Sequence, residues 1–329
     1  MLSRSFVDET RKSWDGKGPR PLLTRVWYPA AAGKQSDILE PGTPFAVPRV
    51  VQGGKLSSRS RTYPLVVLSH GTGGSALQMM WLGHYLAAHG YIAAALNHHG
   101  NTAIEPPTPQ GFLLVWERAK DVTVLLDKML ADPTFGPRID RRRIGAAGFS
   151  LGGYTVIAIA GGRFSPKQFE LFCHSPEQDF TCEPQPEFPQ ARAQFEEIKT
   201  DAAVQESLRH AEDSFRDPRV KAVFAVAPAL GGGFIAESLS EIRVPAQIVV
   251  GEGDTVAPPA TNARRLASLV PGARLTVMPG AVGHYTFLAE CTPHGRSTIS
   301  ICRDGPGVDR AETHAWANRL AVAFFESAW

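Results

Sequence analysis

The chain has 329 residues, of which 43% are hydrophobic and 20% charged, and its formal net charge is +2. This length and apolar content suffice to bury a large core, and we expect one domain spanning 1–329. The charges are dispersed, which argues against a nucleic-acid partner or an anionic membrane surface. No run of about 18 apolar residues predicts membrane insertion, and the N-terminus lacks the apolar centre of a signal peptide.

Short apolar segments typical of strands alternate with longer segments of helical periodicity. The alternation predicts an α/β fold, in which a doubly wound, mostly parallel sheet carries helices on both faces. Residues 22–30 predict an antiparallel strand at the N-terminal edge of that sheet. We expect the other strands at 62–70, 91–98, 142–149, 220–228, 246–254 and 273–280, and helices at 75–89, 112–131, 151–161, 259–270 and 310–328.

Residues 163–216 interrupt this alternation as a long insertion rich in Phe, Pro, Glu and Gln. Within it, residues 189–215 predict one or two charged surface helices. The insertion follows the helix at 151–161, so we place it at the C-terminal edge of the sheet rather than in a separate domain. A lid over a site at that edge and a solvated decoration are the two alternatives.

The four cysteines form two local pairs, Cys173 with Cys182 and Cys291 with Cys302, each within loop-like sequence. Two disulfides and four reduced thiols both fit this spacing. As written, the chain predicts a cytoplasmic protein. Disulfides would instead indicate a periplasmic or secreted protein from which an export signal has been removed.

Ser150 lies in "GFSLG" (148–152), between a predicted strand and a predicted helix. This is the G-x-S-x-G pattern of a nucleophile elbow, a turn so sharp that side chains at Gly148 and Gly152 would collide with neighbouring elements. The turn exposes the serine hydroxyl at the sheet edge and aims the N-terminus of the helix at the group that the serine attacks. We therefore predict that Ser150 is a nucleophile.

A nucleophilic serine needs a general base and an acid that orients the base. In a nucleophile-elbow fold these follow the serine in the order acid, histidine, at the ends of later strands. Asp254 ends the strand at 246–254 and His284 follows the next strand, so we predict these two residues as acid and base. Glu252 is the alternative acid. His294 and His314 are the weaker candidates for the base.

The segment "LSHGTGGSA" (68–76) passes from a strand through a glycine-rich turn into a helix. Such a turn lets backbone amides face the site, and we predict an oxyanion hole formed by the N–H groups of Thr72 and Leu151. A phosphate-binding loop is the alternative for this glycine cluster. The segment lacks the Lys-Ser/Thr ending of a P-loop and the spacing of a dinucleotide fingerprint.

Several histidines cluster in sequence and raise the alternative of a catalytic metal. His98 and His99 are adjacent, but neighbouring residues of a regular strand point to opposite faces and do not readily share one ion. The other clustered histidines are His70, His84 and His89. We predict that these side chains orient loops around the site, and we expect neither a metal nor another cofactor.

Several stretches of the chain resemble the α/β-hydrolase superfamily, and within it the predicted dienelactone hydrolases and platelet-activating-factor acetylhydrolase-like serine esterases. They cover nearly the whole chain outside the insertion. The matching stretches are "RVWYPA" (25–30), "VVLSHGTGG" (66–74), "LAAHGYIAAALNHHGNT" (86–102), "GFSLGG" (148–153), "DPRVKAVFAVAP" (217–228), "GHYTFLAEC" (283–291) and "CRDGPGVDRAETH" (302–314).

This resemblance implies carboxylic-ester hydrolysis through an acyl-serine intermediate, with Ser150 as nucleophile, His284 as base and then acid, and Asp254 as the orienting carboxylate. Members of this branch are often exported, which favours a disulfide between Cys291 and Cys302. Two departures limit the transfer. Dienelactone hydrolases use a cysteine nucleophile, whereas this elbow holds serine. In phospholipase-like members the acid can follow the preceding strand, where this chain has Pro228.

The substrate is expected to be a small neutral ester, short-chain or aromatic, because no arginine cluster accompanies the motifs. Met80, Trp81, Tyr285 and Phe287 are candidates for the pocket wall, with helix core as the alternative. An acyltransferase or a lipase- or phospholipase-like acylhydrolase could use the same residues. A binding module that has lost the chemistry is the remaining alternative.

Overall fold

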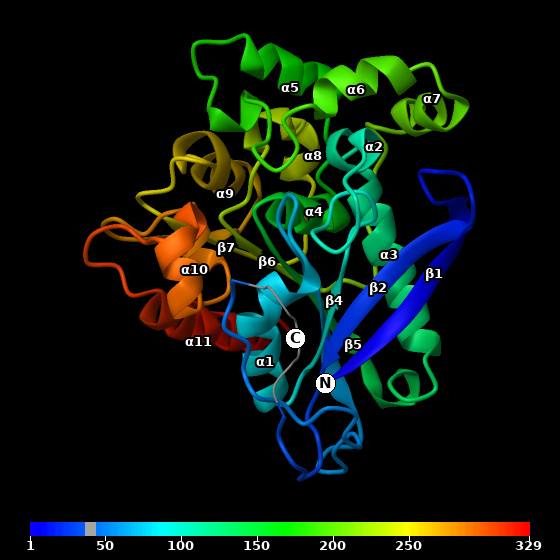
Figure 1. Ribbon diagram of the computed structural model, residues 1–329, viewed down its shortest axis with the longest axis vertical. Coiled ribbons are helices and arrows are strands. Elements are labelled where there is room, and N and C mark those ends of the chain that lie inside the picture. The colour runs from blue at the N-terminus through cyan, green and yellow to red at the C-terminus, as the bar shows by residue number, and fades with distance from the viewer. Residues whose placement is uncertain (37–43) are drawn as a thin grey trace.

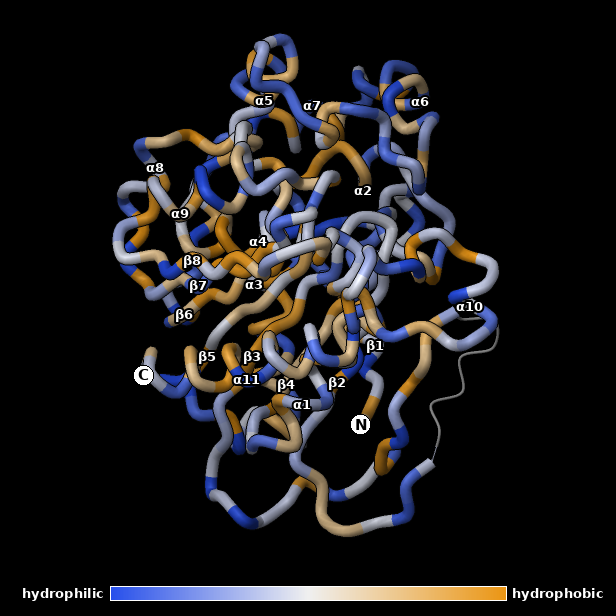
Figure 2. Tube along the Cα trace, turned by 90° about the vertical axis from the view of Figure 1, so that its left-hand side faces the viewer, coloured by the Kyte–Doolittle hydropathy of each residue, from blue (hydrophilic) through white to orange (hydrophobic). Residues whose placement is uncertain are grey.

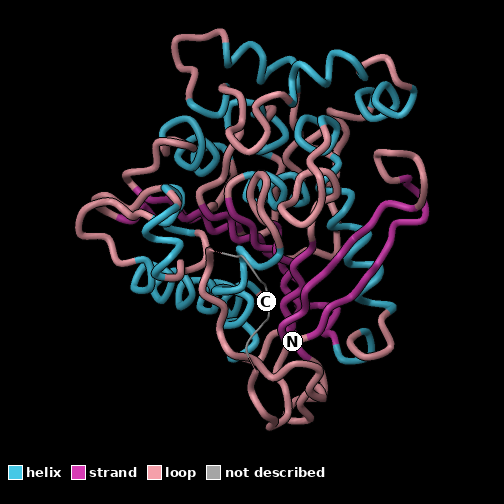
Figure 3. The backbone as a smooth tube through the Cα atoms, in the orientation of Figure 1, coloured by secondary structure: helices cyan, strands magenta, loops and turns pink. Residues whose placement is uncertain are grey.

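The computed structural model describes residues 1–36 and 44–329. Within them, one twisted eight-stranded sheet crosses the molecule in the order β1-β2-β4-β3-β5-β6-β7-β8 (Figure 3). The strands from β4 to β8 in this order are parallel, while β2 pairs antiparallel with both β1 and β4. The strands are β1 (Leu2–Lys12), β2 (Pro19–Trp27), β3 (Tyr63–Ser69), β4 (Ile92–Leu96), β5 (Ile139–Phe149), β6 (Ala222–Val226), β7 (Ala246–Gly251) and β8 (Arg274–Met278).

The predicted doubly wound sheet is confirmed, and its parallel strands lie at the expected positions. The antiparallel strand predicted at 22–30 is β2, but β2 is not the edge of the sheet. The edge strand is β1, which the sequence reading missed. Its sequence alternates polar and half-buried residues and includes only one buried side chain, that of Asp8, so it lacks the apolar character by which the other strands stand out.

Helices cover both faces of the sheet (Figure 1). The helices α1 (Met80–Ala88) and α11 (Arg310–Ala328) pack together on one face, and α3 (Glu117–Ala131) and α4 (Leu151–Ala160) pack on the other. The helix predicted at 112–131 is broken at residues 114–116. The remaining α-helices of the described residues are α2 (Pro109–Leu113), α5 (Pro166–Cys173), α6 (Ala191–Ile198), α7 (Ala202–Arg209), α8 (Ala236–Ser240), α9 (Arg265–Leu269) and α10 (Pro293–Thr298).

Small residues let these helices lie close to the central strands. All ten residues of α4 are buried, and β4 is the apolar run "IAAAL". At Gly145 of β5, a Cβ atom would lie 2.6 Å from the ring of Phe325 on α11. Figure 2 shows the central strands as largely hydrophobic. The core therefore holds the strand ends, and the side chains that follow them, in fixed positions.

The insertion places α5, α6 and α7 beyond the carboxyl ends of the parallel strands, at the top of Figure 1. The chain leaves the core after α4 and returns at Asp217, whose N–H donates to the carbonyl oxygen of Ile159 at 3.0 Å. The two ends of the insertion are therefore neighbours at the base of this segment.

Both cysteine pairs form disulfides. Cys173 is bonded to Cys182 within the insertion, and Cys291 is bonded to Cys302 near the C-terminus, so the alternative of reduced thiols does not apply to this structure. Among the described residues, no helix combines the length and the apolar composition needed to cross a bilayer.

Candidate active site

Ser150 occupies the sharp turn between β5 and α4. Its backbone φ of 56° lies in the left-handed region, which costs a residue with a side chain of order 1–3 kcal/mol. A Cβ atom at Gly148 would run into the carbonyl oxygen of Gly152, and one at Gly152 would run into that of Ser69. The predicted collision of side chains at these two positions is thus confirmed. The turn holds the Ser150 side chain at the carboxyl edge of the sheet.

The structure brings the three predicted side chains into one hydrogen-bonded line. His284 Nε2 lies 2.9 Å from Ser150 Oγ, and His284 Nδ1 lies 2.7 Å from Asp254 Oδ2. The other carboxylate oxygen of Asp254 accepts from the N–H groups of Val256 and Ala257. All three side chains are buried. This geometry lets the Asp254 carboxylate accept from an N–H at Nδ1 and places Nε2 where it can accept from the serine hydroxyl.

The alternative residues lie elsewhere. The Glu252 carboxylate turns away and accepts from the N–H of Gly280 at 3.0 Å. His294 is exposed on α10, and His314 is buried on α11. Pro228, at the position considered above for an acid on the preceding strand, packs against Gly153.

The two predicted oxyanion donors lie at the same place as the serine, because Thr72 and Leu151 line a cavity together with Ser150. Leu151 is the first residue of α4, so its N–H has no acceptor within the helix. In the described part of the chain, neither amide donates to a protein acceptor. The neighbouring Gly73 N–H, by contrast, is occupied by Asn101 Oδ1 at 2.6 Å.

Two buried histidines fix the strand end that leads into this glycine turn. His70 Nδ1 lies 2.7 Å from the carbonyl oxygen of Gly71, and its Nε2 accepts from the backbone N–H of His98. His98 Nε2 in turn lies 2.9 Å from Ser69 Oγ. Burial, with the nearby charge of Arg118, lowers the pKa of His98 to about 3 and that of His70 well below the ordinary value. Both rings are therefore neutral, as their acceptor roles require.

Asp121 holds the His98 ring in place. Its buried carboxylate accepts from Arg20 Nε and Arg11 Nη2, each at 2.7 Å, and lies 3.0 Å from His98 Nδ1. Burial acts to raise the pKa of Asp121, but the charges of Arg20 and Arg11 outweigh it and hold the pKa well below its usual range. His70 and His98 thus orient this loop, as the sequence indicated, through a charged anchor at Asp121 that the sequence did not show. His84 and His89 do not, because His84 lies within α1 and His89 at its end, where it bonds to the carbonyl oxygen of Tyr85.

Replacing Asp121 by alanine should lower the free energy of unfolding by about 3–5 kcal/mol, because it leaves buried arginine charge without a partner. Urea unfolding at pH 7 measures the loss. Asp15→Ala is the matched control, since Asp15 forms an exposed ion pair with Lys17 and should leave the unfolding midpoint nearly unchanged. A loss no larger than that of the control would contradict the anchoring role.

Trp81 and His314 hold the turn that carries His284. The indole N–H of Trp81 on α1 donates to the carbonyl oxygen of Phe287 at 2.9 Å, and His314 Nε2 lies 2.9 Å from that of Thr286. The Trp81 and His314 rings stack with centroids 4.5 Å apart. Burial, with the charge of Arg310, lowers the pKa of His314 to about 4. This neutral histidine and its stacked indole position the 3₁₀ turn His284–Phe287.

This lowered pKa predicts acid sensitivity. Between pH 6.5 and about 4 the unfolded chain binds a proton at residue 314 that the folded chain does not. The free energy of unfolding should therefore fall as the pH falls through this window, by about 1.4 kcal/mol per pH unit for this group. His314→Gln should remove this group's share of the slope between pH 6.5 and 5, measured by urea unfolding, while buried His70 and His98 keep theirs. Trp81→Phe is the control that lowers stability similarly at both pH values, and an unchanged slope in His314→Gln would contradict the prediction.

The cavity beside Ser150 has a volume of about 290 Å³ and mostly apolar walls. One wall comes from residues 112–116, around the break between α2 and α3, and another from residues 229–230 after β6. Thr72, Ser150, Leu151 and Val256 also line it, and the insertion contributes Phe164, Phe169, Phe180, Phe188 and Phe195. The insertion therefore lines the cavity beside Ser150. The sequence alone did not decide between a lid over the site and a solvated decoration. Seven of the 17 phenylalanines fall within 163–216, more than a solvated decoration needs, and this was the available signal.

The four residues predicted for the pocket wall do not line this cavity. Met80 and Phe287 are buried in the core, and Trp81 is held between Phe287 and α11. Tyr285 lies edge-on to the His284 ring, with centroids 5.5 Å apart, outside the cavity. Met80 and Trp81 lie outside this cavity because α1 packs against the sheet and α11. Phe287 lies in the 3₁₀ turn after His284 and is fully buried.

No group of three or more His, Cys, Asp or Glu side chains with the geometry of a metal site occurs within 1–36 and 44–329. The clustered histidines have other partners. His99 Nδ1 lies 2.8 Å from Glu105 Oε1, and His89 Nδ1 lies 2.8 Å from the carbonyl oxygen of Tyr85.

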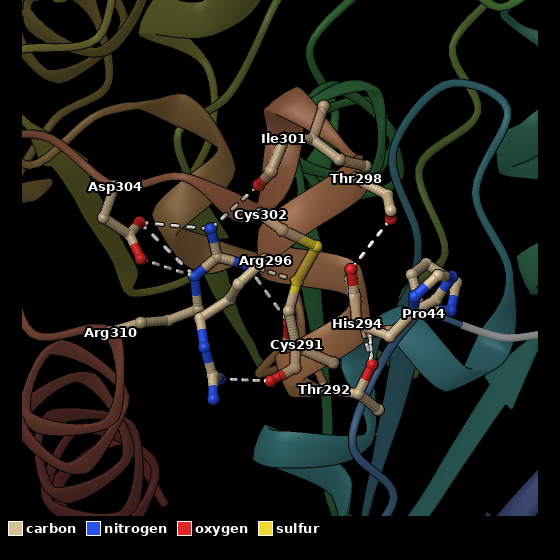
Figure 4. The surroundings of a disulfide bond; sticks show 12 residues. Pro44, Cys291, Thr292, His294, Arg296, Thr298, Ile301, Cys302, Asp304 and Arg310 are labelled. Carbon is tan, nitrogen blue, oxygen red and sulfur yellow. Dashed lines mark hydrogen bonds and ion pairs between the residues drawn. A yellow bond between two sulfur atoms is a disulfide. The ribbon is translucent and has the colours of Figure 1, made fainter.

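The Cys291–Cys302 disulfide joins the two ends of a loop that follows His284 in the chain (Figure 4). Arg310, at the start of α11, is buried beside it. Its guanidinium donates to the carbonyl oxygens of Ala289 and Ile301 and to the Asp304 carboxylate. The disulfide and this arginine together tie the segment to α11.

The sheet order, the elbow and the Ser–His–Asp line define the fold and site of an α/β hydrolase. Residues 66–292 match the Alpha/beta hydrolase family, and the chain belongs to that family.

The chain is also similar to individual esterases. Cutinase est1 from Thermobifida alba is 30% identical over 106 residues, which are 32% of this chain and 32% of that protein. Lipase 1 from Moraxella sp. (strain TA144) is 34% identical over 83 residues, 25% of this chain and 23% of the lipase. The matched region thus spans about a third or less of these relatives. The structure of a ferulic acid esterase from Streptomyces cinnamoneus shares the fold, with a TM-score of 0.64 and 21% identity over 99% of this chain and 88% of that one.

Proposed function

We propose that this protein is a serine carboxylic-ester hydrolase that acts on a neutral ester through an acyl-serine intermediate. The observation that carries the proposal is the line from Ser150 through His284 to Asp254, which opens onto an apolar cavity beside two unoccupied amides. A serine hydroxyl becomes an effective nucleophile when an oriented base can take its proton. The matches to a cutinase and a lipase, both named for ester hydrolysis, support the proposal.

In the first step, Ser150 Oγ attacks the ester carbonyl carbon while His284 Nε2 takes the hydroxyl proton. The N–H groups of Thr72 and Leu151 donate to the oxyanion, and each donor of this kind contributes about 3 kcal/mol. The bond to the alcohol oxygen then breaks, and His284 returns its proton to the leaving alcohol. Water, deprotonated by His284, next attacks the acyl-serine, which releases the acid and restores Ser150.

The test combines turnover with active-site labelling. The purified protein should hydrolyse 4-nitrophenyl butyrate, and a fluorophosphonate should add one phosphonyl group to the peptide that contains Ser150, as read by mass spectrometry. Product analysis with added methanol measures any acyl transfer to an alcohol. A folded protein that neither hydrolyses the ester nor takes up the label overturns the proposal and favours a binding module.

The narrower class and the compartment are part of the proposal. The segment "GHYTFLAEC" supports a relation to predicted dienelactone hydrolases and platelet-activating-factor acetylhydrolase-like esterases, without lactone chemistry, since the nucleophile is serine. Two disulfides support a periplasmic or extracellular location, because disulfides persist in oxidising compartments.

A further inference from the structure

We propose that residues 163–216 form a fixed aromatic roof over Ser150, and that the cavity below this roof binds the acyl group of an ester of an aromatic acid. This inference rests on the proposed ester hydrolysis and names the part of the substrate that the cavity takes. It also assigns the insertion a role in substrate choice.

The position of the cavity relative to His284 identifies which half of the ester lies in it. The cavity is lined by Ser150 and by the two oxyanion residues, Thr72 and Leu151, but His284 is not among its lining residues. The leaving alcohol must receive its proton from His284, so the alcohol oxygen lies on the His284 side of the serine. The acyl group then extends the other way, past Leu151 and into the cavity.

Seven aromatic side chains line the cavity. The roof contributes five phenylalanines, and Phe112 and Trp116 add two more rings from the break between α2 and α3. The Phe112 and Phe188 rings meet edge-on with centroids 5.2 Å apart, which joins the two walls. Aromatic rings pair favourably in edge-to-face and offset geometries beyond the free energy of apolar burial, so these walls suit an aromatic acid.

Phe180 is the exposed ring among the roof phenylalanines that line the cavity. Phe180 lines the cavity and is nevertheless 40% exposed, whereas Phe164 and Phe188 are buried. The charged lining residues Glu183 and Arg192 are also exposed, which places them at the rim. A substrate ring below Phe180 would cover apolar surface that now faces solvent.

The roof is anchored to the core at separate points. The Trp116 indole N–H donates to Ser207 Oγ of α7 at 2.9 Å, and Asn262 Nδ2 donates to Asp179 Oδ2 of the roof at 2.9 Å. The side-chain amide of Gln168 on α5 donates to the carbonyl oxygen of Phe234 at 2.6 Å. A binding surface anchored in this way is formed before the substrate arrives, which lowers the entropic cost of binding.

The Cys173–Cys182 disulfide fixes the roof internally. It joins the end of α5 to the 3₁₀ turn Phe180–Cys182, which carries the exposed ring. The carbonyl oxygen of Cys182 accepts from Arg192 Nη2 on α6 at 2.6 Å. These contacts link two roof helices around Phe180, as a fixed roof requires and a mobile lid does not.

The experiment compares three esters of one alcohol, so that only the acyl group differs. We would measure kcat/KM for the 4-nitrophenyl esters of acetate, decanoate and 3-phenylpropanoate, whose carbonyl groups are not conjugated with a ring. The expected order places 3-phenylpropanoate first, at about tenfold or more above acetate. Phe180→Ala and Phe195→Ala should each lower the ratio of phenylpropanoate to acetate by about tenfold. Leu171→Ala is the matched control, because Leu171 lies on the roof, is 63% exposed and does not line the cavity.

The outcomes separate this inference from the proposed function. Hydrolysis of acetate without a preference for phenylpropanoate, or an unchanged ratio in both phenylalanine variants, overturns the aromatic acyl site and leaves ester hydrolysis intact. A preference for decanoate over phenylpropanoate assigns the cavity to linear chains and also overturns it. Failure to hydrolyse any of the three esters overturns both proposals.

Discussion

Ser150→Ala is expected to lower kcat for ester hydrolysis on the order of 10⁶-fold, because no other oxygen can form the acyl-enzyme at this position. The variant should also lose all labelling by a fluorophosphonate. Its fold should persist, since the Ser150 side chain makes its hydrogen bond with His284 alone among the described residues. Steady-state hydrolysis of 4-nitrophenyl butyrate and thermal unfolding measure the two effects.

The control for this variant is Ser240→Ala, which makes the same change at an exposed serine whose hydroxyl bonds to the carbonyl oxygen of Glu237. It should match the wild type in turnover and labelling. Turnover by Ser150→Ala at a rate comparable with wild type would place the nucleophile elsewhere.

Asp254→Asn is expected to lower kcat by about 10⁴-fold with little change in KM. The amide would retain the shape of the carboxylate, but it would donate towards His284 Nδ1 and favour the tautomer with its proton on Nε2. That tautomer cannot accept the proton of Ser150. The substitution also removes the negative charge that stabilises the imidazolium formed during the reaction.

Glu252→Gln is the matched control for this prediction, because Glu252 was the alternative acid and turns instead to the N–H of Gly280. The two variants make the same chemical change two residues apart. Equal losses of kcat in both variants would show that the proximity of His284 to Asp254 is not what activates Ser150.

The nucleophile region could be predicted because its constraints are local. The strand before Ser150, the helix after it and the glycines at 148 and 152 are all contiguous in sequence. Asp254 and His284 follow from the same reasoning, because consecutive parallel strands bring their carboxyl ends to one edge. Local pattern and global fold agree in this region.

The walls of the cavity could not be predicted in this way. Helical periodicity runs through 112–131, yet the helix breaks before Glu117, where the indole of Trp116 bonds to Ser207, 91 residues away in sequence. A contact over that separation has no signature in a local window. The prediction that Met80 and Trp81 line the pocket was wrong for a related reason. An apolar helix face has the same sequence pattern whether it faces a pocket or the core.

The hydrogen bond between Asp217 and Ile159 has an evolutionary consequence. Because the chain leaves and rejoins the core at adjacent points, a change in these more than fifty residues need not shift the end of α4 or the start of β6. In the proposed acyl site, part of the selectivity for the acid would then lie in the insertion, whereas Ser150, Asp254 and His284 lie outside it. On that proposal, changes within the insertion would alter which acids are accepted and would leave the three side chains that transfer the proton in place.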